Sequence, residues 1–457
     1  MQLKRVLTLR TVVATSAGLT LASSSFVAAT MVANFVLGDA AWIAILIGGA
    51  LCFLAAACFS ELNGMLPSAA GIRLYFSRAF NEQVSLVVSL LYMLIVVVGV
   101  VGVESFIISQ VLHEAMPLVP PYAWIVAMLL LVTALNLRGV KMAGVFQDLV
   151  TYTLIALLVA LGIFALYKTG FKLDAPLSPG GAVGIVNAVA LGVFLFVGFE
   201  WVTPLVEEVT QTKQIYRGMM IALGILSVVY AIFTTAMTAA VPKDVLLAAP
   251  APQLVLARTV LGGLGVSVMI VVILFTSMKT FNAGLISVSR FMYASAREHV
   301  LPAIFSKISM RYFTPWVAII TLFFIGLLAA AMTTLTKNYM VLVGLAAAME
   351  SIVYTMAGLA VISLRRREPG RERPYLIKGG YLVPGATVVV FAILAVAVLA
   401  SEPTALLYMA GAFALAFVYV KTAVPHLKKK HEARRPAARR RRRPARAMVE
   451  VEGERGK

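Results

Sequence analysis

The sequence predicts an all-α integral membrane protein with twelve transmembrane helices. Of its 457 residues, 61% are hydrophobic and only 13% are charged, which is far from the composition of a soluble domain. A helix needs about 20 apolar residues to cross a bilayer, and the chain contains twelve apolar segments on this measure. The expected spans are residues 11–36, 41–60, 84–112, 122–137, 146–168, 183–206, 218–241, 260–288, 315–335, 339–364, 382–400 and 403–420.

The loops between these spans predict the orientation. Lysine and arginine precede the first span and recur in every second loop, whereas the alternate loops carry few charges. Basic loops stay in the cytoplasm, and an even number of spans returns the chain to its starting side. We therefore expect a multi-pass protein of the cell (cytoplasmic) membrane with both termini in the cytoplasm. The basic loops include Arg73 and Arg78, Arg138 and Lys141, Lys213 and Arg217, Arg290 and Arg297, and Arg365 to Arg367.

Much of the net charge of +19 lies beyond the last span. Residues 421–457 contain three successive lysines from Lys428 and a run of arginines from Arg439 to Arg443. Such a dense charge block predicts a disordered cytoplasmic tail that touches anionic membrane lipid. No aromatic residue is interleaved with the arginines, so we do not expect a nucleic-acid partner.

Two of the expected spans are interrupted. Residues 16–26 contain Gly18 and several hydroxyl side chains, and residues 194–204 contain Gly198, Glu200 and Pro204. A break in a membrane-buried helix frees backbone polar groups, which must find partners in protein, water or ligand. Two such breaks, one opening each half of a chain, are typical of the binding site of a transporter. The alternative is a pair of small-residue packing faces, which explains Gly18 but not Glu200.

Five motifs follow one another at the ends of the spans. Their residues resemble those of the amino acid-polyamine-organocation superfamily of permeases, from Ser16 to about Pro384. One departure is Ala22-Ser23-Ser24 at the first break, where many relatives carry glycine, a small residue and glycine. The motifs are E-L-x-x-x-x-P-x-x-x-G from Glu61 with Tyr75 after it, N-L-R-G-V-K from Asn136, G-F-E from Gly198 with Glu207-Glu208 after it, S-R-x-x-Y-A-x-A-R-E-x-x-L-P from Ser289, and R-R-R-E-P from Arg365 with R-P from Arg373.

The resemblance implies the leucine-transporter fold. In that fold two inverted repeats of five helices, here residues 11–168 and 183–364, are followed by two peripheral helices at 382–420. Residues 1–420 would then form a single transporter domain with substrate between the two breaks. Backbone N–H groups around the first break would hold a carboxylate, and carbonyls of both breaks would hold an ammonium. The expected substrate-binding residues are Gly18, Ala22, Ser23, Ser24, Ser25, Glu104, Phe194, Gly198, Phe199 and Glu200.

Phe194 matches the aromatic lid that the family places over bound substrate. Its alternative is an ordinary core phenylalanine. Glu200 resembles family acids that couple proton or substrate binding to conformational change, and the alternative is a structural acceptor for freed N–H groups. We therefore treat Glu200 as a candidate for both substrate binding and coupling.

Four ionisable residues are expected inside the bilayer, namely Glu104, Glu200, Lys279 and Glu350. A charge at the centre of a membrane helix costs about 2.5 to 3.5 kcal/mol, so these groups must face a cavity or one another. In sodium-coupled relatives, sodium sits between spans 1 and 8 against two adjacent hydroxyl residues. That pair aligns with Met278 and Lys279 here, so an ammonium would replace the ion.

Lys279 therefore argues against sodium and is a candidate coupling residue. Burial disfavours the charged form, so Lys279 could take up and release a proton during transport. A static ammonium that holds the helices together and an ion pair with a nearby glutamate are equally favoured alternatives. Glu104 would attract a cationic substrate group, unless a salt bridge neutralises it and the substrate is a neutral amino acid.

Other acidic residues are expected to be structural. Glu350 has Tyr354 one turn later and is interpreted as a gate or helix-pairing residue. Glu61, Glu207 and Glu208 lie beside basic loops at the ends of spans, so we expect them to form salt bridges of an inner gate.

The sequence gives no indication of an enzyme. It contains no nucleotide-binding glycine loop, no nucleophile with a nearby base and no cluster of metal ligands, so neither cofactor nor metal is expected. We predict a secondary active transporter for amino acids that works by alternating access, without sodium and with protons. A polyamine or small-amine carrier, an amino acid exchanger and a non-transporting sensor remain alternatives, and the oligomeric state is open.

Overall fold

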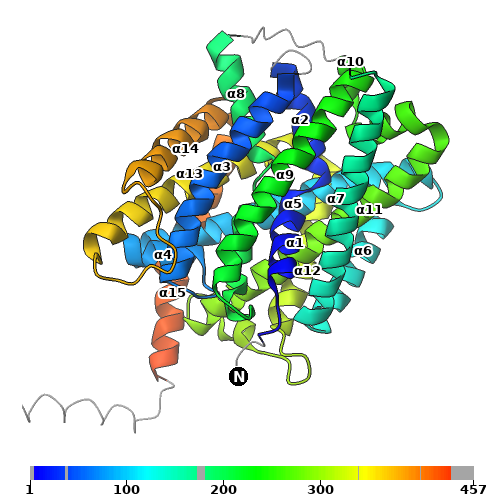
Figure 1. Ribbon diagram of the computed structural model, residues 1–457. Helices are drawn as coiled ribbons and strands as arrows, with labels where there is room; N and C mark the ends of the chain where they lie inside the picture. Colours follow the sequence, from blue (N-terminus) through cyan, green and yellow to red (C-terminus); the bar gives the residue numbers. More distant parts are fainter. Residues whose placement is uncertain (1–4, 36–39, 172–180, 338, 402, 434–457) are drawn as a thin grey trace, which may run out of the picture.

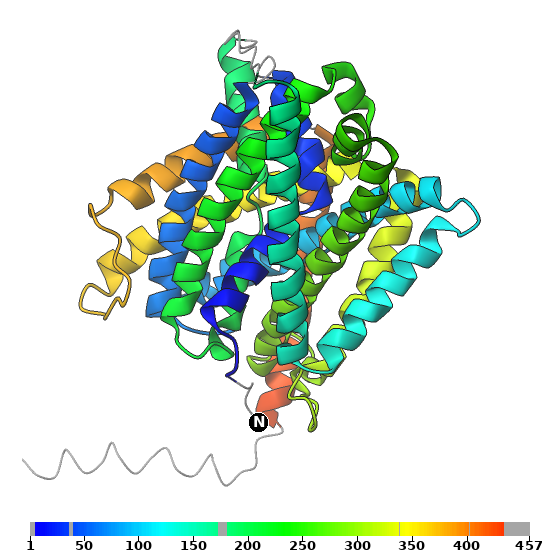
Figure 2. The ribbon, with the colours of Figure 1, turned by 45° about the vertical axis from the view of Figure 1, so that its right-hand side comes forward.

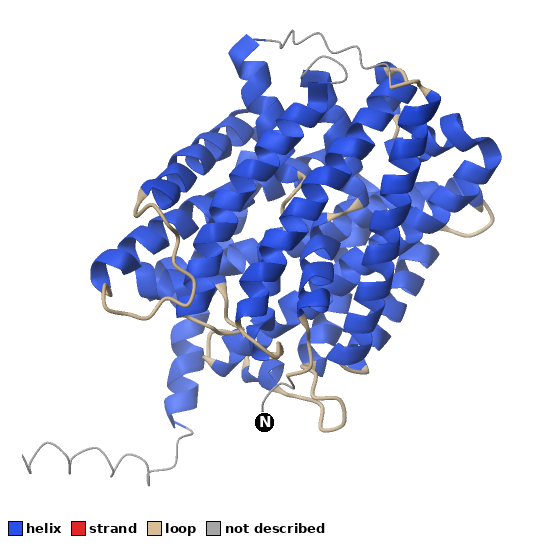
Figure 3. Cartoon of the chain, viewed as in Figure 1, coloured by secondary structure: helices blue, strands red, loops and turns tan. Residues whose placement is uncertain are grey.

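The protein is a bundle of helices (Figures 1 and 3). The computed structural model describes residues 5–35, 40–171, 181–337, 339–401 and 403–433. Within these residues the only β-type pairing is an isolated bridge between Leu7 and Val209. The long helices are α3 (Ala41–Met65), α5 (Glu82–Ala115), α7 (Val140–Lys168), α9 (Lys213–Ala240), α11 (Pro252–Arg297), α12 (Trp316–Thr336), α13 (Tyr339–Arg367), α14 (Leu382–Ser401) and α15 (Pro403–Ala433).

All twelve expected segments lie on helices, with three qualifications. The first segment is divided into α1 (Leu9–Thr20) and α2 (Ser23–Phe35), which are bent by 57°. The fourth, α6 (Pro121–Leu137), has 17 residues. It therefore spans about 26 Å, slightly less than the hydrocarbon core of about 30 Å. In the described residues ten helices are long and apolar enough to cross a membrane, and the bent pair makes an eleventh.

The sixth segment is also divided. Helix α8 (Gly181–Phe194) ends in a turn, after which the chain continues as the 3₁₀ helix η2 (Phe199–Glu207). Gly198 has a φ of 104° at this turn, a conformation that glycine adopts without strain. Pro204 lies inside η2 and cannot donate a backbone hydrogen bond there.

The broken segments lie in the middle of the bundle. Helix α1 packs against α7, α9, α11 and η2, while α2 packs against α8. In Figure 2, α1 and α2 run through the centre of the molecule with α7 and α9 beside them. The two breaks are therefore neighbours in space although about 170 residues separate them.

Helix α8 is held very close to α3. A Cβ atom at Gly48 would lie 2.5 Å from the carbonyl carbon of Gly192, and one at Gly192 would lie 2.8 Å from the carbonyl oxygen of Ala44. The two backbones thus touch without intervening side chains. This contact fixes the helix that leads into the second break.

Short helices connect the long ones, namely α4 (Ile72–Ala79), α10 (Lys243–Ala248) and η3 (Ala303–Ser306). Helix α1 begins and α15 ends at the same end of the bundle, which is the lower end in Figure 1. We call this end the terminal side. An even number of spans predicts this arrangement.

The tail differs from the expectation at its start. Residues 421–433 are not disordered but continue α15 as far as Ala433. Lysine and alanine favour helix, and basic side chains are favourable in a last helical turn. Lys421 Nζ also donates to Gln83 Oε1 at 3.0 Å, and Lys428 forms an ion pair with Glu82. The rest of the predicted tail, residues 434–457, lies outside the described residues.

Candidate functional site: two broken helices around one cavity

The first break frees backbone carbonyls at the end of α1. In a continuous helix the carbonyls of residues 18 to 21 would accept hydrogen bonds from the N–H groups four residues later. Here the N–H of Ala22 donates instead to Thr20 O at 3.0 Å, and the N–H of Ser25 donates to Ala22 O at 3.2 Å. The carbonyls of Gly18 and Leu21 therefore need other partners.

Lys279 supplies those partners. Its Nζ donates to Gly18 O at 2.8 Å and to Leu21 O, and Thr280 Oγ1 donates to Gly18 O at 3.2 Å. The ammonium is fully buried at the carboxyl end of α1, where a helix dipole favours positive charge. Within the described residues Lys279 forms no ion pair with a carboxylate, so that alternative for this residue is not realised.

The carbonyl of Thr20 is also bonded. Thr20 O accepts from Ser25 Oγ at 3.0 Å and from the hydroxyl of Tyr230 on α9 at 2.9 Å. Gly18 itself packs against α7, since a Cβ atom there would lie 1.8 Å from Gln147 Nε2. The break is therefore supported by side chains from α7, α9 and α11.

Glu104 of α5 binds the other half of the broken helix. Its Oε1 accepts the N–H of Ser24 at 2.8 Å and its Oε2 accepts from Ser277 Oγ at 3.2 Å. The carboxylate is fully buried at the amino end of α2, which favours negative charge. No ion pair of Glu104 occurs among the described residues. The protein's own carboxylate thus occupies a position where a substrate carboxylate was expected.

The second break is tied to the first. Ser16 Oγ on α1 donates to Phe199 O at 2.9 Å. Leu19 packs on Gly198, because a Cβ atom at Gly198 would lie 3.1 Å from Leu19 Cγ. The N–H of Gly198 donates to Glu350 Oε1 at 3.3 Å. The two breaks are therefore in direct contact with each other, and the second is bonded to α13.

Glu200 and Glu350 lie together with two tyrosines. The hydroxyl of Tyr92 on α5 contacts Glu200 Oε1 and lies 2.9 Å from Glu350 Oε1, and the hydroxyl of Tyr354 lies 2.8 Å from Glu200 Oε2 and 2.9 Å from Glu350 Oε1. All four side chains are buried. The sequence predicted the proximity of Glu350 and Tyr354 but missed Tyr92 and the pairing of the two carboxyls. A tyrosine inside an apolar span needs a partner for its hydroxyl, and this signal marks Tyr92.

A narrow cavity is bounded by both breaks. Ala22, Ser24, Ser25 and Phe194, all expected substrate-binding residues, line it, whereas Gly18, Ser23, Glu104, Gly198, Phe199 and Glu200 do not. The lining is mostly apolar, with three hydroxyl groups and no charged side chain. The lining residues are Leu19, Thr20, Ala22, Ser24, Ser25, Gly99, Val100, Val103, Phe194, Val197, Leu342, Val343 and Ala346.

Ion pairs join helices on the terminal side of the bundle. Arg290 Nε lies 2.8 Å from Glu208 Oε2 with both side chains fully buried, and Arg297 Nη2 lies 3.0 Å from Glu207 Oε1. The backbone carbonyl of Glu208 also accepts the N–H groups of Val6 and Leu7 at 2.8 and 3.0 Å. The N-terminal segment is thereby fastened across this end.

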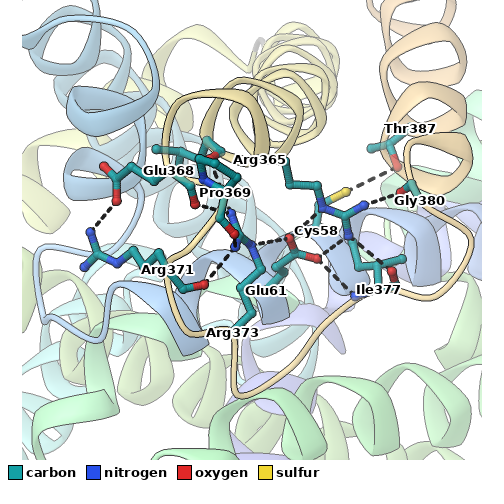
Figure 4. A network of polar contacts seen from close by, with 11 residues as sticks. Cys58, Glu61, Arg365, Glu368, Pro369, Arg371, Arg373, Ile377, Gly380 and Thr387 are labelled. Atoms are coloured by element: carbon teal, nitrogen blue, oxygen red, sulfur yellow. Dashed lines mark hydrogen bonds and ion pairs between the residues drawn. The ribbon is translucent and has the colours of Figure 1, made fainter.

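Glu61 is the centre of a second network (Figure 4). Arg365 Nη2 lies 2.6 Å from its Oε2, Arg373 Nε lies 3.3 Å from its Oε1, and the N–H of Ile377 donates to Oε2 at 3.0 Å. The salt bridges expected for Glu61, Glu207 and Glu208 are thus confirmed.

Arg73 forms a further ion pair on this side, with Glu298. Burial lowers the pKa of Arg73 to about 10, opposed by the charge of Glu82. This value leaves the guanidinium charged at neutral pH, so the ion pair persists there.

The bundle of apolar helices with two broken segments around a common cavity defines a multi-pass membrane permease. The family model described as Amino acid permease matches residues 7–424, and the chain belongs to this family. Members are membrane transporters, so the protein is a permease and not an enzyme.

Three relatives illustrate the family. The chain is 26% identical to the Asc-type amino acid transporter 1 of Homo sapiens over 376 residues, which are 78% of this chain and 70% of the relative. It is 28% identical to an amino acid permease of Bacillus subtilis over 397 residues, 83% and 87% of the two chains. It is 26% identical to the gamma-aminobutyric acid permease of Escherichia coli over 363 residues, 73% and 76% of the two chains.

Gly198→Ala is expected to lower transport by about tenfold. The left-handed conformation costs an L-residue about 1 to 2 kcal/mol, and the added methyl group would press on Leu19 at the first break. Uptake into liposomes measures the effect. Gly411→Ala on α15 is the matched control, because a Cβ atom there meets nothing within 4 Å. Wild-type uptake by Gly198→Ala would show that the second break does not need this conformation.

Proposed function

We propose that the protein is a secondary active transporter for small neutral amino acids that works by alternating access, is independent of sodium and is driven by protons. The observation that carries this proposal is the cavity bounded by residues of both breaks. A substrate in it touches α1, α2 and the turn after α8, so its binding can be linked to their movement.

The cavity lining supports a neutral substrate. A basic amino acid or a polyamine would bring a second positive charge into a space lined by no charged side chain, and an unpaired buried charge is costly. Glu104 does not compensate, since its two oxygens bind Ser24 and Ser277. The small apolar lining at Gly99, Val103 and Ala346 fits a short side chain.

Two groups at the cavity can hold the substrate backbone. The hydroxyl of Ser24 has no hydrogen-bond partner among the described residues and can donate to a carboxylate. The carbonyl of Val197, in the turn between α8 and η2, can accept from an ammonium. The carbonyls of Gly18 and Phe199, which the sequence also suggested, already bind Lys279 and Ser16.

The bonds of Lys279 support sodium independence. Its ammonium and the hydroxyl of Thr280 satisfy the carbonyl of Gly18, and the ammonium also binds Leu21 O. A sodium ion held by these oxygens would have to displace the Lys279 side chain. The proton is the remaining coupling ion, with Lys279 and Glu200 as the candidates from the sequence.

We further infer the leucine-transporter fold, with inverted repeats at residues 11–168 and 183–364, peripheral helices at 382–420 and one transporter domain over residues 1–420. The support is that each repeat begins with a broken helix, α1–α2 in the first and α8–η2 in the second. We also infer that the terminal side faces the cytoplasm, because the basic loops lie there with α1 and the end of α15.

Uptake by purified protein in liposomes tests the function. Labelled alanine is expected to enter under an inward proton gradient without sodium, and a protonophore is expected to abolish its accumulation, while arginine and putrescine enter poorly. Uptake that needs internal amino acid and resists the protonophore would establish an exchanger. Absence of flux for all three compounds would favour a sensor.

Filling the cavity gives a second test of the site. Ala346→Phe places a ring among the lining residues and is expected to abolish alanine uptake. Leu415→Phe adds a ring on the exposed face of α15 and serves as the control, because Leu415 is 71% exposed. Equal uptake by the two variants would exclude this cavity as the substrate site.

A further inference from the structure

The buried carboxyls of Glu200 and Glu350, which we call the carboxyl pair, share the same hydrogen-bonding hydroxyls. Glu200 is on η2, just after the second break, and Glu350 is on α13. The hydroxyls of Tyr92 and Tyr354 each contact both carboxyls, at 2.9 Å from Glu350 Oε1 in both cases. The two acids are therefore immediate neighbours, although 150 positions separate them in the sequence.

Counting hydrogens shows that the carboxyl pair is not fully ionised. The two tyrosines and two carboxyls make four oxygen–oxygen contacts. Each phenol has one hydrogen and can donate in only one of its two contacts. If both acids were ionised, the other two contacts would bring lone pairs together without a hydrogen. A proton on one carboxyl supplies a donor for one of these two contacts, so that one oxygen–oxygen pair without a hydrogen remains instead of two.

Electrostatics leads to the same result. Among the described residues neither acid of the carboxyl pair forms an ion pair, and both are at most 1% exposed. The groups that face them are neutral, namely Tyr92 of α5, Tyr354 of α13, Cys52 of α3 and the N–H of Gly198. Trp201 of η2 stacks on the ring of Tyr92. Two neighbouring carboxylates in such an environment cannot both ionise without a cation.

We propose that Glu200 and Glu350 together bind one proton, and that this is the proton transported with the amino acid. The second part of this inference rests on the proposed function. The proposal assigns the proton to the carboxyl pair as a whole and thus includes Glu350, which the sequence suggested only as a gate or helix-pairing residue. The proposal does not use Lys279, whose Nζ is bonded to the carbonyls of Gly18 and Leu21 at the first break.

The position of the carboxyl pair couples the proton to movement of the second break. Glu350 Oε1 accepts the N–H of Gly198, so α13 is bonded to the turn before η2. Loss of the proton leaves two negative charges that repel, which favours separation of η2 from α13. Return of the proton favours the closed arrangement. By linkage, substrate that stabilises the closed arrangement also tightens proton binding.

One oxygen of the carboxyl pair is open to exchange. Glu350 Oε2 is buried and has no hydrogen-bond partner among the described residues. A proton on this oxygen would displace no existing hydrogen bond. The other carboxylate oxygens of the pair are occupied by tyrosine hydroxyls.

Infrared titration of the purified protein tests proton binding without reference to transport. Wild-type protein is expected to show the C=O stretching band of a protonated carboxyl at neutral pH, which disappears at alkaline pH. Glu350→Gln and Glu200→Gln are each expected to lower the pH at which this band is half lost, because the remaining acid stays buried but no longer has a neighbouring carboxylate to repel it. The double variant is expected to lose the band. An unchanged titration in both single variants, or a band of wild-type intensity in the double variant, would overturn the inference.

Transport by the same variants tests coupling. Glu350→Gln is expected to lower proton-driven accumulation of alanine by about 5- to 150-fold, the usual range of an allosteric coupling, while alanine exchange persists. Glu114→Gln is the control, because Glu114 is 64% exposed and its ion-pair partner in the described part of the chain is Arg258. Full proton-driven accumulation by Glu350→Gln would overturn the coupling role.

The two proposals fail in distinguishable ways. A wild-type protein that shows the infrared band but moves no amino acid would leave the proton site intact and refute the proposed function. Tyr354→Phe covers the case in which a glutamine variant does not fold. It keeps both acids but removes one bridging hydroxyl, and it is expected to shift the pH at which the band is half lost. An unchanged titration in Tyr354→Phe would contradict the shared site.

Discussion

Lys279→Met is expected to lower amino acid uptake by at least about 100-fold. Methionine has a similar length but cannot donate to the carbonyls of Gly18 and Leu21, which the break leaves without helical partners. Hydrogen bonds to a charged group are worth about 1.5 to 3 kcal/mol each, and about 1.4 kcal/mol is a factor of ten. Uptake of labelled alanine into liposomes under a proton gradient measures the loss.

Lys141→Met is the matched control, because Lys141 is exposed at the start of α7. It is expected to transport like the wild type. If Lys279→Met transports normally, the ammonium does not hold the first break and cannot be the reason for sodium independence.

Lys279→Ser is expected to create a sodium requirement. The serine hydroxyl, Thr280 Oγ1 and the two freed carbonyls would then present oxygen atoms to a cation without an ammonium among them. Oxygen atoms are the ligands that hard cations prefer. Sodium is therefore expected to stimulate uptake by Lys279→Ser and to leave the wild type unaffected. Stimulation of the wild type would contradict sodium independence.

The breaks were predictable because they depend on local sequence. Gly18, Gly198 and Pro204 stand where an unbroken membrane helix would carry apolar residues such as leucine. The chain is not α-helical at residues 21–22 and 195–198. The position of Lys279 was also predictable. The resemblance to the family placed Lys279 where sodium-coupled relatives have a hydroxyl residue of span 8 that faces span 1.

The partners of the acids were not predictable in the same way. Glu104 binds Ser24, 80 residues away, because α5 packs against α2. Glu200 meets Glu350, 150 residues away, because α5 packs against α13 and the tyrosines of these two helices reach Glu200 of η2. Spacing along one helix contains no information about such pairs. The cost of a buried charge indicated that each acid needed a partner, but not which one.

Arg290→Met is expected to destabilise the closed terminal side and the fold. The bond between Arg290 and Glu208 is fully buried on both sides. Removal of one partner leaves an uncompensated buried charge, which costs about 3 to 5 kcal/mol. We expect a lower thermal-unfolding midpoint in detergent. We also expect uptake to fall by more than about 100-fold, because alternating access needs a state in which the terminal side is held closed by this ion pair.

The double variant Glu208→Gln with Arg290→Met separates the buried charge from a general loss of packing. Because it removes both charges, it is expected to be more stable than Arg290→Met alone, even though it carries one more substitution. Arg258→Met is the control, since the Arg258–Glu114 pair is exposed and such pairs contribute about 0 to 1 kcal/mol. If the double variant is no more stable than Arg290→Met, the cost lies in lost packing around the guanidinium, and the buried pair does not determine the closure of this side.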